Sequence, residues 1–539
     1  MKGFFLAGRD AIWYAGGMTY LAVSIKVSGI KESLQEIARA QASGAEAVEL
    51  RLDYAQTELA GDDVQMLIEA AHRMGLMVLA TCRPNWEGGN YQDSEQQRLG
   101  ILRLATARGA DFVDVELACF QREGFDIGHL TDPQAAEAGH EKTKFLLSSH
   151  DFTAKPADIA QRLDRMADFG ADVCKIAYQA DSIEDSFEAL DVVRERAAVG
   201  QAVVALAMGQ AGVMTRLLAK KLGAFLTFAS LTPESQTAPG QLTVEQMKSV
   251  FRWDEVNRGT KVFGVIGFPV AHSMSPALHN GSFRQVNYNG LYLPMLVEPG
   301  WERFRAFVDG MRQRQWLNLR GLSVTIPHKH NALEYVRANN GQLERLAEQI
   351  GAVNTLLFEG DKVSGFNTDY AGSLDAITNT LGISRHELKG MSAAVVGAGG
   401  AARALVAGLT DVGAQVTIYN RTVDKAKILG QEFDSEWAGL EQLRQLDCEL
   451  LVNATSIGMH PHVDESPVPG EYLKKGMAVF DTVYNPPRTL LLREAAAAGA
   501  TVVDGVAMFV NQAAAQFEMF TQQRAPLALM RKILENQLG

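Results

Sequence analysis

The chain has 539 residues, of which 47% are hydrophobic and 21% are charged, and its formal net charge is -12 at pH 7. A single hydrophobic core rarely organises so many residues, so we expect at least two domains. The negative net charge repels nucleic acid and anionic membranes, which argues against both as partners. An anionic small molecule would have to be bound by local arginine or lysine side chains.

The cysteines indicate neither a metal site nor a disulfide framework, since they form no CxxC pair and no Cys/His cluster. They are spread along the chain as Cys82, Cys119, Cys174 and Cys448. This usage fits a reducing compartment, so we expect a cytoplasmic protein, or one of the plastid stroma if the source is a plant.

The first residues, 1–18, are apolar but are interrupted by Arg9 and Asp10. They lack the basic start and long apolar centre of a secretory signal, so we interpret them as a short leader. No segment of the sequence is apolar over the length that a membrane span requires.

Residues 19–256 alternate short β-branched, apolar runs with amphipathic stretches of helical spacing. About eight such runs occur: YLAVSI, AEAVELRLDY, LMVLATCR, DFVDVEL, KFLLSSHDF, DVCKIAY, AVVALAMG and FLTFAS. Eight strands, each followed by a helix, close a (β/α)8 TIM barrel. The connection after DFVDVEL is the least helical of the set.

The alternation of strand-like and helix-like stretches begins again around VFRWDEVNRGTKVFGVIG, which places a domain boundary near Asn257 to Thr260. We expect residues 261–368 to form one α/β lobe and residues 369–500 to form a Rossmann-type lobe. Residues 501–539 look helical and are expected to pack back on the first of these lobes and complete it. The predicted fold class is therefore α/β throughout.

A lysine, Lys175, interrupts the apolar run DVCKIAY. Burying an ammonium group is costly, so a lysine in this place is expected to be neutral and nucleophilic, as attack on a ketone requires. A structural ion pair is equally compatible with the residue type alone. Polar residues also stand at the ends of other apolar runs. These are the positions at which the catalytic groups of a barrel converge.

Six motifs, ELRLDY, TCRPNWEGG, SSHDF, DVCKIA, AMGQAG and TAPGQ, follow in an order and spacing that resemble type I 3-dehydroquinate dehydratases over nearly the whole first half. The resemblance implies that Lys175 forms an imine with the C3 ketone of the substrate. It also implies that His150 removes a C2 proton and later protonates the departing C1 hydroxyl, with Glu87 orienting the imidazole.

The same resemblance implies a set of substrate contacts. Arg216 would hold the substrate carboxylate, for which guanidinium offers bidentate geometry. Thr237 stands where serine is common in the family. The remaining implied contacts are Ser24, Glu49, Arg51, Arg83, Met208, Phe228 and Gln241.

The stretch SAAVVGAGGAARALVAGL reads as a strand, a glycine-rich turn and a helix, the context of a dinucleotide-binding fingerprint. The turn is formed by Gly397, Ala398, Gly399, Gly400 and Ala401. Its glycines let the backbone approach a pyrophosphate at a helix N-terminus.

The next predicted strand, AQVTIYNRT, ends in Asn420, Arg421 and Thr422, where an NAD enzyme would place an acidic residue. Arg421, aided by Lys425, offers positive charge to a 2′-phosphate instead. The sequence therefore predicts NADP as the cofactor.

Upstream, GVIGFPVAHSMSPALHN, GLSVTIPHK, GAVNTL and GFNTDYAG resemble the shikimate dehydrogenase family. The resemblance implies that Lys329, held by Asp369, donates a proton, and that Ser273 and Ser275 bind the substrate carboxylate. Ser323 replaces an asparagine that many bacterial members carry. Further implied residues are Thr325, Asn354, Tyr484 and Gln512 for the substrate ring, and Thr455, Val483, Gly505 and Met508 for the cofactor.

The two resemblances predict successive reactions, because 3-dehydroshikimate, the product of the first half, is the substrate of the second. We expect a monomer with separate active sites for small molecules, using NADP and no metal. One alternative makes the second half a quinate dehydrogenase. Another is a non-enzymatic regulator that senses quinate-type ligands, although such a scaffold would be expected to have lost some of Lys175, His150, Lys329 and Asp369.

Overall fold

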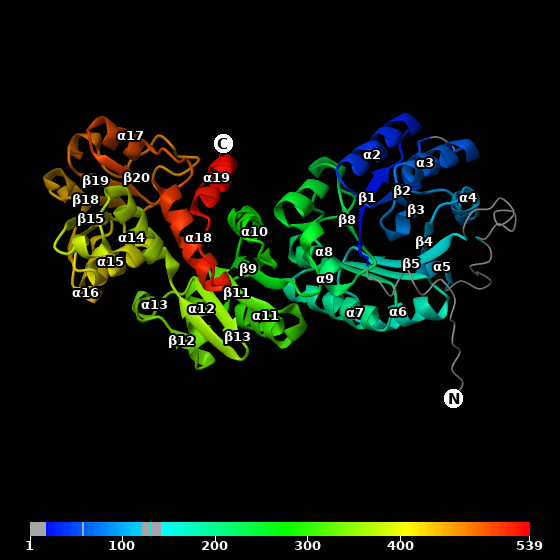
Figure 1. Cartoon of the computed structure of the whole chain (residues 1–539), viewed down its shortest axis with the longest axis horizontal. Helices are drawn as coiled ribbons and strands as arrows, with labels where there is room; N and C mark the ends of the chain where they lie inside the picture. Colours follow the sequence, from blue (N-terminus) through cyan, green and yellow to red (C-terminus); the bar gives the residue numbers. More distant parts are fainter. Residues whose placement is uncertain (1–17, 57–58, 121–129, 131–141, 539) are drawn as a thin grey trace. The chain divides into compact units, whose positions relative to one another are not determined.

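The computed structural model describes residues 18–56, 59–120, 130 and 142–538 (Figure 1). The chain divides at about Thr260 into two compact units. Nearly all of the predicted leader lies outside the described residues. Among the described residues, every helix is too short or too polar to traverse a lipid bilayer.

The first unit is a ring of eight parallel strands in the order β7-β6-β5-β4-β3-β2-β1-β8. Across the seam, the Phe225 amide before β8 donates a 2.8 Å hydrogen bond to the Val203 carbonyl of β7, so the ring is nearly closed. The strands are β1 (Tyr20–Lys26), β2 (Ala47–Arg51), β3 (Met77–Thr81), β4 (Phe112–Glu116), β5 (Lys144–Asp151), β6 (Val173–Gln179), β7 (Val203–Met208) and β8 (Leu226–Ala229). The predicted barrel is confirmed.

Helices lie outside the ring of strands (Figure 1). They are α2 (Ile30–Ala42), α3 (Gly61–Arg73), α4 (Glu95–Ala107), α5 (Leu117–Phe120), α6 (Ile159–Asp168), α7 (Ser186–Ala198), α8 (Val213–Leu217) and α9 (Ala219–Leu222). Of the weakly helical connection after β4, α5 is described, and residues 121–129 and 131–141 lie outside the described residues.

The inside of the barrel is layered because side chains alternate along each strand. A floor of apolar residues includes Leu79, Phe112 and Leu146. Two residues further along these strands the inward positions become polar, with Thr81, Asp114 and Ser148. The same two-residue step places the other polar groups of the barrel at the carboxyl ends of the strands, above the apolar floor.

The second unit contains two six-stranded sheets. The first has the order β10-β9-β11-β13-β14-β12 and mixes parallel and antiparallel pairs. Its strands are β9 (Lys261–Gly267), β10 (Gly290–Leu296), β11 (Leu319–Val324), β12 (Gln342–Leu343), β13 (Thr355–Glu359) and β14 (Lys362–Phe366). Its helices are α10 (Ser275–Gln285), α11 (Trp301–Gln313), α12 (Lys329–Ala338) and α13 (Arg345–Ile350).

The other sheet is parallel throughout and has the order β17-β16-β15-β18-β19-β20. Numbered from its first strand this is 3-2-1-4-5-6, the Rossmann order, which confirms the predicted dinucleotide-binding topology. The strands are β15 (Ser392–Val396), β16 (Gln415–Tyr419), β17 (Glu436–Ala438), β18 (Leu450–Asn453), β19 (Ala478–Asp481) and β20 (Thr501–Val503). The helices are α14 (Thr368–Leu381), α15 (Gly400–Asp411), α16 (Val423–Glu432) and α17 (Leu490–Ala497).

The C-terminal segment forms α18 (Gly505–Thr521) and α19 (Leu527–Leu538). Helix α18 packs along α14 and reaches the mixed sheet at β11 and β13, while α19 packs on α10. A Cβ on Gly321 of β11 would lie 2.4 Å from the Phe520 ring of α18, so this contact requires glycine. The C-terminal helices thus pack on the mixed sheet and on α10, which come first in the second unit.

Candidate active sites

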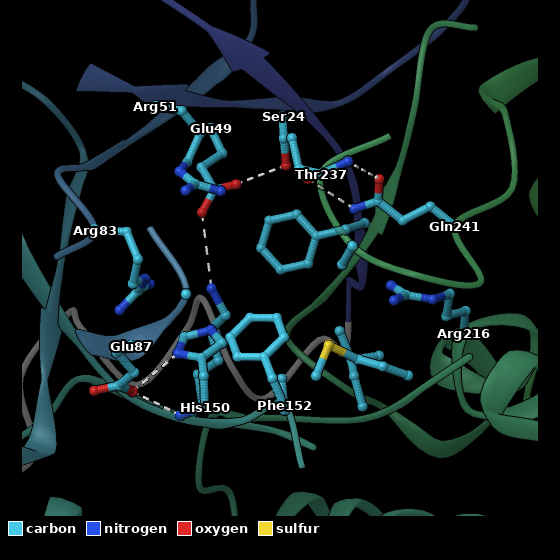
Figure 2. Close-up of a pocket in the computed structure, with 17 residues that line it drawn as sticks. Ser24, Glu49, Arg51, Arg83, Glu87, His150, Phe152, Arg216, Thr237 and Gln241 are labelled. Carbon is cyan, nitrogen blue, oxygen red and sulfur yellow. Dashed lines mark hydrogen bonds and ion pairs between the residues drawn. The ribbon is translucent and has the colours of Figure 1, made fainter. Parts of the chain in front are cut away.

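Every residue predicted for the first site lines one pocket at the carboxyl ends of the barrel strands. Figure 2 shows His150 and Arg216 approaching this pocket from different sides. The wall is completed by Gly88, Phe152, Ala177, Leu206 and Ala238. The six motifs, distant in sequence, therefore converge on a single concave site.

Lys175 on β6 is 4% exposed, and its amine is surrounded on several sides. Nζ lies 3.0 Å from Asp114 Oδ2 and 3.7 Å from Glu49 Oε1. It also lies 4.7 Å from the centre of the Phe228 ring. The amine is buried as expected, and the adjoining carboxylates of Asp114 and Glu49 form the ion pair that the residue type alone also allowed.

His150, at the end of β5, is paired with Glu87. Glu87 Oε1 accepts a hydrogen bond from the His150 backbone N–H at 2.6 Å and lies 3.1 Å from ring Nδ1. Burial lowers the pKa of His150 well below its ordinary value, and the Arg83 and Lys175 cations act in the same direction. Burial raises the pKa of Glu87 to about 7, although Arg83 opposes this. A neutral imidazole held at Nδ1 leaves Nε2 as a base.

The two glycines after Glu87 explain the EGG motif. Gly88 has φ +75°, and a Cβ there would lie 2.1 Å from the Phe152 ring. A Cβ on Gly89 would lie 2.0 Å from the Arg83 carbonyl oxygen. The loop can therefore fold back over the end of β3 and bring Glu87 to His150 only if both positions lack a side chain.

Arg216 of α8 is 2% exposed, and its Nε and Nη1 have no hydrogen-bond partner among the described residues. Its Nη2 donates a weak 3.4 Å hydrogen bond to the Pro239 carbonyl. Burial lowers the pKa of Arg216 to about 10, still well above neutrality. An uncompensated buried cation is costly, so this one predicts an anionic group of a ligand.

The loop beside Arg216 is closed by its own hydrogen bonds. The Thr237 N–H donates to Gln241 Oε1 at 2.9 Å, and Gln241 Nε2 donates to Thr237 Oγ1 at 3.0 Å. Thr237 therefore supplies the hydroxyl that serine would supply.

Several groups that lie behind the pocket-lining residues were missed by reasoning from the sequence. Asp114 and Glu116 both point inward from β4, and each accepts a 2.6 Å hydrogen bond from Arg83. Ser148 donates a hydrogen bond to Asp114 Oδ1, and Asp53 accepts two hydrogen bonds from Arg51. Two carboxylates two residues apart in a buried strand were the available signal for Asp114 and Glu116.

The second unit brings together Lys329 and Asp369, as predicted for the second site. Lys329 Nζ donates a 2.6 Å hydrogen bond to Asp369 Oδ2, and Asn354 Nδ2 donates to Oδ1 at 2.9 Å. Asp369 lies in the first turn of α14, whose N-cap Asn367 accepts the Asp369 N–H at 3.0 Å. These hydrogen bonds fix the position of the Asp369 side chain beside Lys329.

A buried hydrogen-bond chain fixes Asn354 from behind. Gln516 of α18 donates to Thr355 Oγ1 at 3.0 Å and accepts from Ser323 Oγ at 2.7 Å, and Thr355 Oγ1 donates to Asn354 Oδ1 at 2.8 Å. Ser323 thus holds Gln516, a residue that no motif in the sequence singled out.

The other predicted substrate residues lie at strand ends and in helices of the same unit. Ser273 and Ser275 stand at the start of α10, where the Ser275 N–H donates to Ser273 Oγ at 3.3 Å. Thr325 follows β11, and its N–H donates to the Ile266 carbonyl at 2.9 Å. Tyr484 packs on Phe509 with ring centres 5.2 Å apart.

Gln512 lies on α18 against α14. A Cβ on Gly372 of α14 would lie 2.6 Å from its backbone nitrogen. No hydrogen bond among the described residues joins Ser273, Ser275, Tyr484 or Gln512 to the Lys329–Asp369 pair.

The glycine-rich turn fits a dinucleotide. Gly397 has φ +120°, and a Cβ there would lie 3.0 Å from the Ala454 carbonyl oxygen. Beside Gly399 and Gly400 the space is open, and α15 begins at Gly400 with unpaired N–H groups in its first turn. The other predicted cofactor residues lie in the connections that follow these parallel strands or in the first turns of the next helices: Ala398, Ala401, Asn420, Arg421, Thr422, Lys425, Thr455, Val483, Gly505 and Met508.

Arg421 and Lys425 are exposed and form no ion pair within the described residues. They are therefore available to a 2′-phosphate. Thr455 and Val483 are held by a buried pair: Asn453 accepts from the Thr455 N–H at 3.0 Å, and Asp481 accepts from the Val483 N–H at 3.0 Å. The His, Cys, Asp and Glu side chains of the described residues form no cluster able to hold a metal ion.

Known families cover most of the chain. Residues 21–258 match the type I 3-dehydroquinase family. Residues 265–356 match the shikimate dehydrogenase substrate binding domain, residues 381–466 match the shikimate / quinate 5-dehydrogenase family, and residues 505–535 match the shikimate 5'-dehydrogenase C-terminal domain.

Relatives span the whole chain or its second half. The chloroplastic bifunctional 3-dehydroquinate dehydratase/shikimate dehydrogenase of Arabidopsis thaliana is 36% identical over 95% of this chain and 84% of its own length. The shikimate dehydrogenase (NADP(+)) of Methanopyrus kandleri is 43% identical over 52% of this chain and 97% of its own length. That of Methanothermobacter thermautotrophicus is 39% identical over 52% of this chain and 98% of its own length.

The fold and the two sites define a bifunctional enzyme, with a lysine-centred site in a barrel and a dinucleotide-dependent site in an α/β unit. The chain belongs to the family of bifunctional 3-dehydroquinate dehydratase/shikimate dehydrogenases.

Proposed function

We propose that the barrel dehydrates 3-dehydroquinate to 3-dehydroshikimate through an imine on Lys175, and that the second unit reduces 3-dehydroshikimate to shikimate with NADPH. The observation that carries the first half is the buried guanidinium of Arg216, whose Nε and Nη1 are unpartnered in the pocket that also contains Lys175 and His150. Such a pocket suits a small molecule that has a carboxylate for Arg216 and a ketone for Lys175.

In the dehydration, the Lys175 nitrogen attacks the C3 carbonyl after losing a proton, and loss of water leaves a protonated imine. This cation draws electrons from the neighbouring C2–H bond, so His150 Nε2 can remove that proton and leave an enamine. The enamine electrons then expel the C1 hydroxyl, which leaves as water with the proton held by His150. Hydrolysis of the new imine consumes one water and frees 3-dehydroshikimate and Lys175.

The other pocket groups orient the substrate ring. Arg216 pairs with the carboxylate, and Arg83 and Arg51 present N–H groups to ring hydroxyls from the opposite wall. Glu49, which accepts a 2.6 Å hydrogen bond from Ser24, lies beside the imine nitrogen. Met208 and Phe228 form an apolar surface against the ring carbons.

In the reduction, bound NADPH supplies the hydride to the ketone carbon. Lys329 holds the proton that the resulting alkoxide requires, and the 2.6 Å bond to Asp369 keeps its ammonium group in place. Asn354 orients the Asp369 carboxylate. Ser273 and Ser275 offer hydroxyls to the substrate carboxylate, and Thr325, Tyr484 and Gln512 surround the ring.

We further propose that the chain acts as a monomer in a reducing compartment such as the cytoplasm. Its described cysteines are free, and Cys82, Cys119 and Cys174 are buried. Size-exclusion chromatography with light scattering measures the oligomeric state, and a dimer would contradict the proposal.

Borohydride reduction in the presence of 3-dehydroquinate, followed by mass spectrometry of peptides, tests the dehydratase. We expect a covalent adduct on Lys175, formed only when the substrate is present. NADPH oxidation with 3-dehydroshikimate tests the reductase, and quinate with NADP or NAD is its comparison substrate. An unmodified Lys175, or faster turnover of quinate than of shikimate, would contradict the corresponding half.

A further inference from the structure

A buried row of alternating charges leads from α4 to the imine-forming lysine. Arg98 of α4 lies 2.7 Å from Glu116 Oε2, whose other oxygen accepts a 2.6 Å hydrogen bond from Arg83. Arg83 then donates to Asp114 Oδ2 at 2.6 Å, and the same oxygen accepts from Lys175 Nζ at 3.0 Å. We call Arg98, Glu116, Arg83, Asp114 and Lys175 the charge ladder.

We propose that Asp114 is the positioning residue for Lys175: it fixes Nζ at the level of the substrate ketone and holds the positive charge on that nitrogen before and after the imine forms. This inference rests on the proposed dehydratase function and adds a residue to it. Asp114 acts through Lys175, since the described contacts give it no direct place in the pocket lining.

The geometry of Asp114 suits this role. Its side chain is fully buried, and both carboxylate oxygens have partners, with Oδ1 accepting from Ser148 and Oδ2 accepting from Arg83 and Lys175. Ser148 lies opposite Lys175 in the register of β5 and β6. Because Ser148 and Arg83 hold the carboxylate independently of Lys175, it cannot follow a moving lysine, and so it keeps Nζ in one position.

The two acidic residues of the charge ladder differ in the direction of their pKa shifts. Burial alone would raise the pKa of Asp114, but the Arg83 and Lys175 cations hold it well below its ordinary value. Burial raises the pKa of Glu116 despite its two arginine partners. Asp114 is therefore the permanent anion beside Nζ, whereas Glu116 acts on Arg83.

The charge on Nζ changes twice during the reaction. Lys175 must release one proton before its nitrogen can form the C–N bond, and loss of water then returns a positive charge to the same nitrogen as a protonated imine. A fixed anion 3.0 Å away stabilises both cations relative to the neutral amine between them. It therefore keeps the imine in its protonated form, which removal of the C2 proton requires, and it raises the pH at which Lys175 can form the imine.

Other charged groups also face this nitrogen. Glu49 of β2 lies 3.7 Å away, and His150 of β5 is close enough to interact electrostatically with Lys175 and with Arg83, which follows β3. Phe228 of β8 covers the remaining side with its ring. Glu49 is the more distant carboxylate, so removal of Asp114 should change the proton release of Lys175 most.

The test measures imine formation at a series of pH values in the full chain. Wild type, Asp114→Asn and Glu116→Gln are mixed with 3-dehydroquinate and sodium cyanoborohydride, and the adduct on Lys175 is followed by mass spectrometry. We expect Asp114→Asn to move the midpoint of the acid limb down by about one pH unit or more. We expect its trapping rate on the alkaline plateau to fall by about tenfold or more, because Nζ is no longer held.

Glu116→Gln is the matched control, since Glu116 lies on the same strand, is equally buried and contacts Arg83 but not Lys175. Its midpoint should stay at the wild-type value. NADPH-dependent reduction by the same preparations shows that the second unit is intact. If Asp114→Asn does not fold, Asp114→Glu retains the charge but displaces it, and should trap more slowly with an unchanged midpoint.

A wild-type midpoint in Asp114→Asn, an equal shift in Glu116→Gln, or wild-type trapping by Asp114→Glu would overturn the role of Asp114. Failure of the wild-type chain to form any adduct would instead overturn the proposed dehydratase function. The two failures are therefore distinguishable in a single series.

Discussion

The two sites differ in how far their central lysines are removed from water. In the barrel, the Lys175 side chain is 5% exposed and the carboxylates around it are equally buried or more so. In the second unit, the Lys329 side chain is 32% exposed and that of Asp369 is 19% exposed. The barrel lysine is enclosed by strands, whereas the other stands at the start of a helix, α12.

This difference follows from the chemistry that each site has to perform. A covalent imine requires an amine whose neutral and charged forms are balanced by fixed neighbours, which burial makes effective. A proton donor for an alkoxide needs only an ammonium group held in place, and its site must admit both a ketone and a dinucleotide. The open Lys329–Asp369 pair is adequate for the second task and would be unsuitable for the first.

The largest expected effects come from removing one lysine at a time. Lys175→Ala should lower dehydration by about a thousandfold or more, because the one lysine amine among the described residues that line the pocket is lost, and should leave NADPH-dependent reduction intact. Lys329→Ala should do the reverse. Both activities are measured on each purified variant, and an equal loss of both in either variant would show that the sites are not independent.

A smaller effect is expected at Arg216, where activity and stability should move in opposite directions. Arg216→Met removes the partner of the substrate carboxylate, so kcat/KM for 3-dehydroquinate should fall by about 100-fold. It also removes a buried, uncompensated cation, so the free energy of unfolding should rise by about 1 kcal/mol. Steady-state kinetics and chemical denaturation measure the two quantities.

A loss of stability in Arg216→Met would mean that the guanidinium is a structural group rather than a ligand-binding one. Arg51→Met is the matched comparison. Arg51 is buried but makes two hydrogen bonds to Asp53, so its loss leaves a buried carboxylate unpaired and should lower stability.

The strands and their terminal residues were predictable, because buried parallel strands read as short apolar runs and the side chains at their ends were unusual for such runs. The charge ladder was not predictable. It depends on the register of neighbouring strands, such as Thr81 beside Asp114 and Ser148 beside Lys175, which a single sequence does not contain. The link from Ser323 to Gln516, 193 residues apart, was hidden for the same reason.

The choice between NADPH and NADH should depend on the exposed side chain of Arg421. The expected effect is smaller than that at Arg216. Arg421→Ala should lower kcat/KM for NADPH by about tenfold and leave the value for NADH nearly unchanged, since a hydrogen bond to a charged group contributes about 1.5–3 kcal/mol. Kinetics with both nucleotides measure the ratio. Equal losses with NADPH and NADH would indicate that Arg421 does not contact the 2′-phosphate.

The smallest expected change is a change of pH dependence at Glu87. Because burial raises the pKa of Glu87 to about 7, its carboxylate form, which accepts the Nδ1–H of His150, is lost as pH falls through that value. Dehydration by the wild type should therefore rise with pH around 7. Glu87→Gln cannot titrate, so this limb should disappear from the turnover profile, and kcat at higher pH should fall by about fivefold because a neutral acceptor holds the imidazole less firmly.

Imine trapping separates this effect from that of Asp114. Glu87 bonds to His150 and not to Lys175, so Glu87→Gln should leave the pH profile of trapping unchanged while altering that of turnover. Asp114→Asn should move the trapping profile itself. If Glu87→Gln moved the trapping profile too, proton release from Lys175 would depend on the His150–Glu87 pair. Imine formation at Lys175 and proton transfer by His150 would then not be independent, as the geometry predicts them to be.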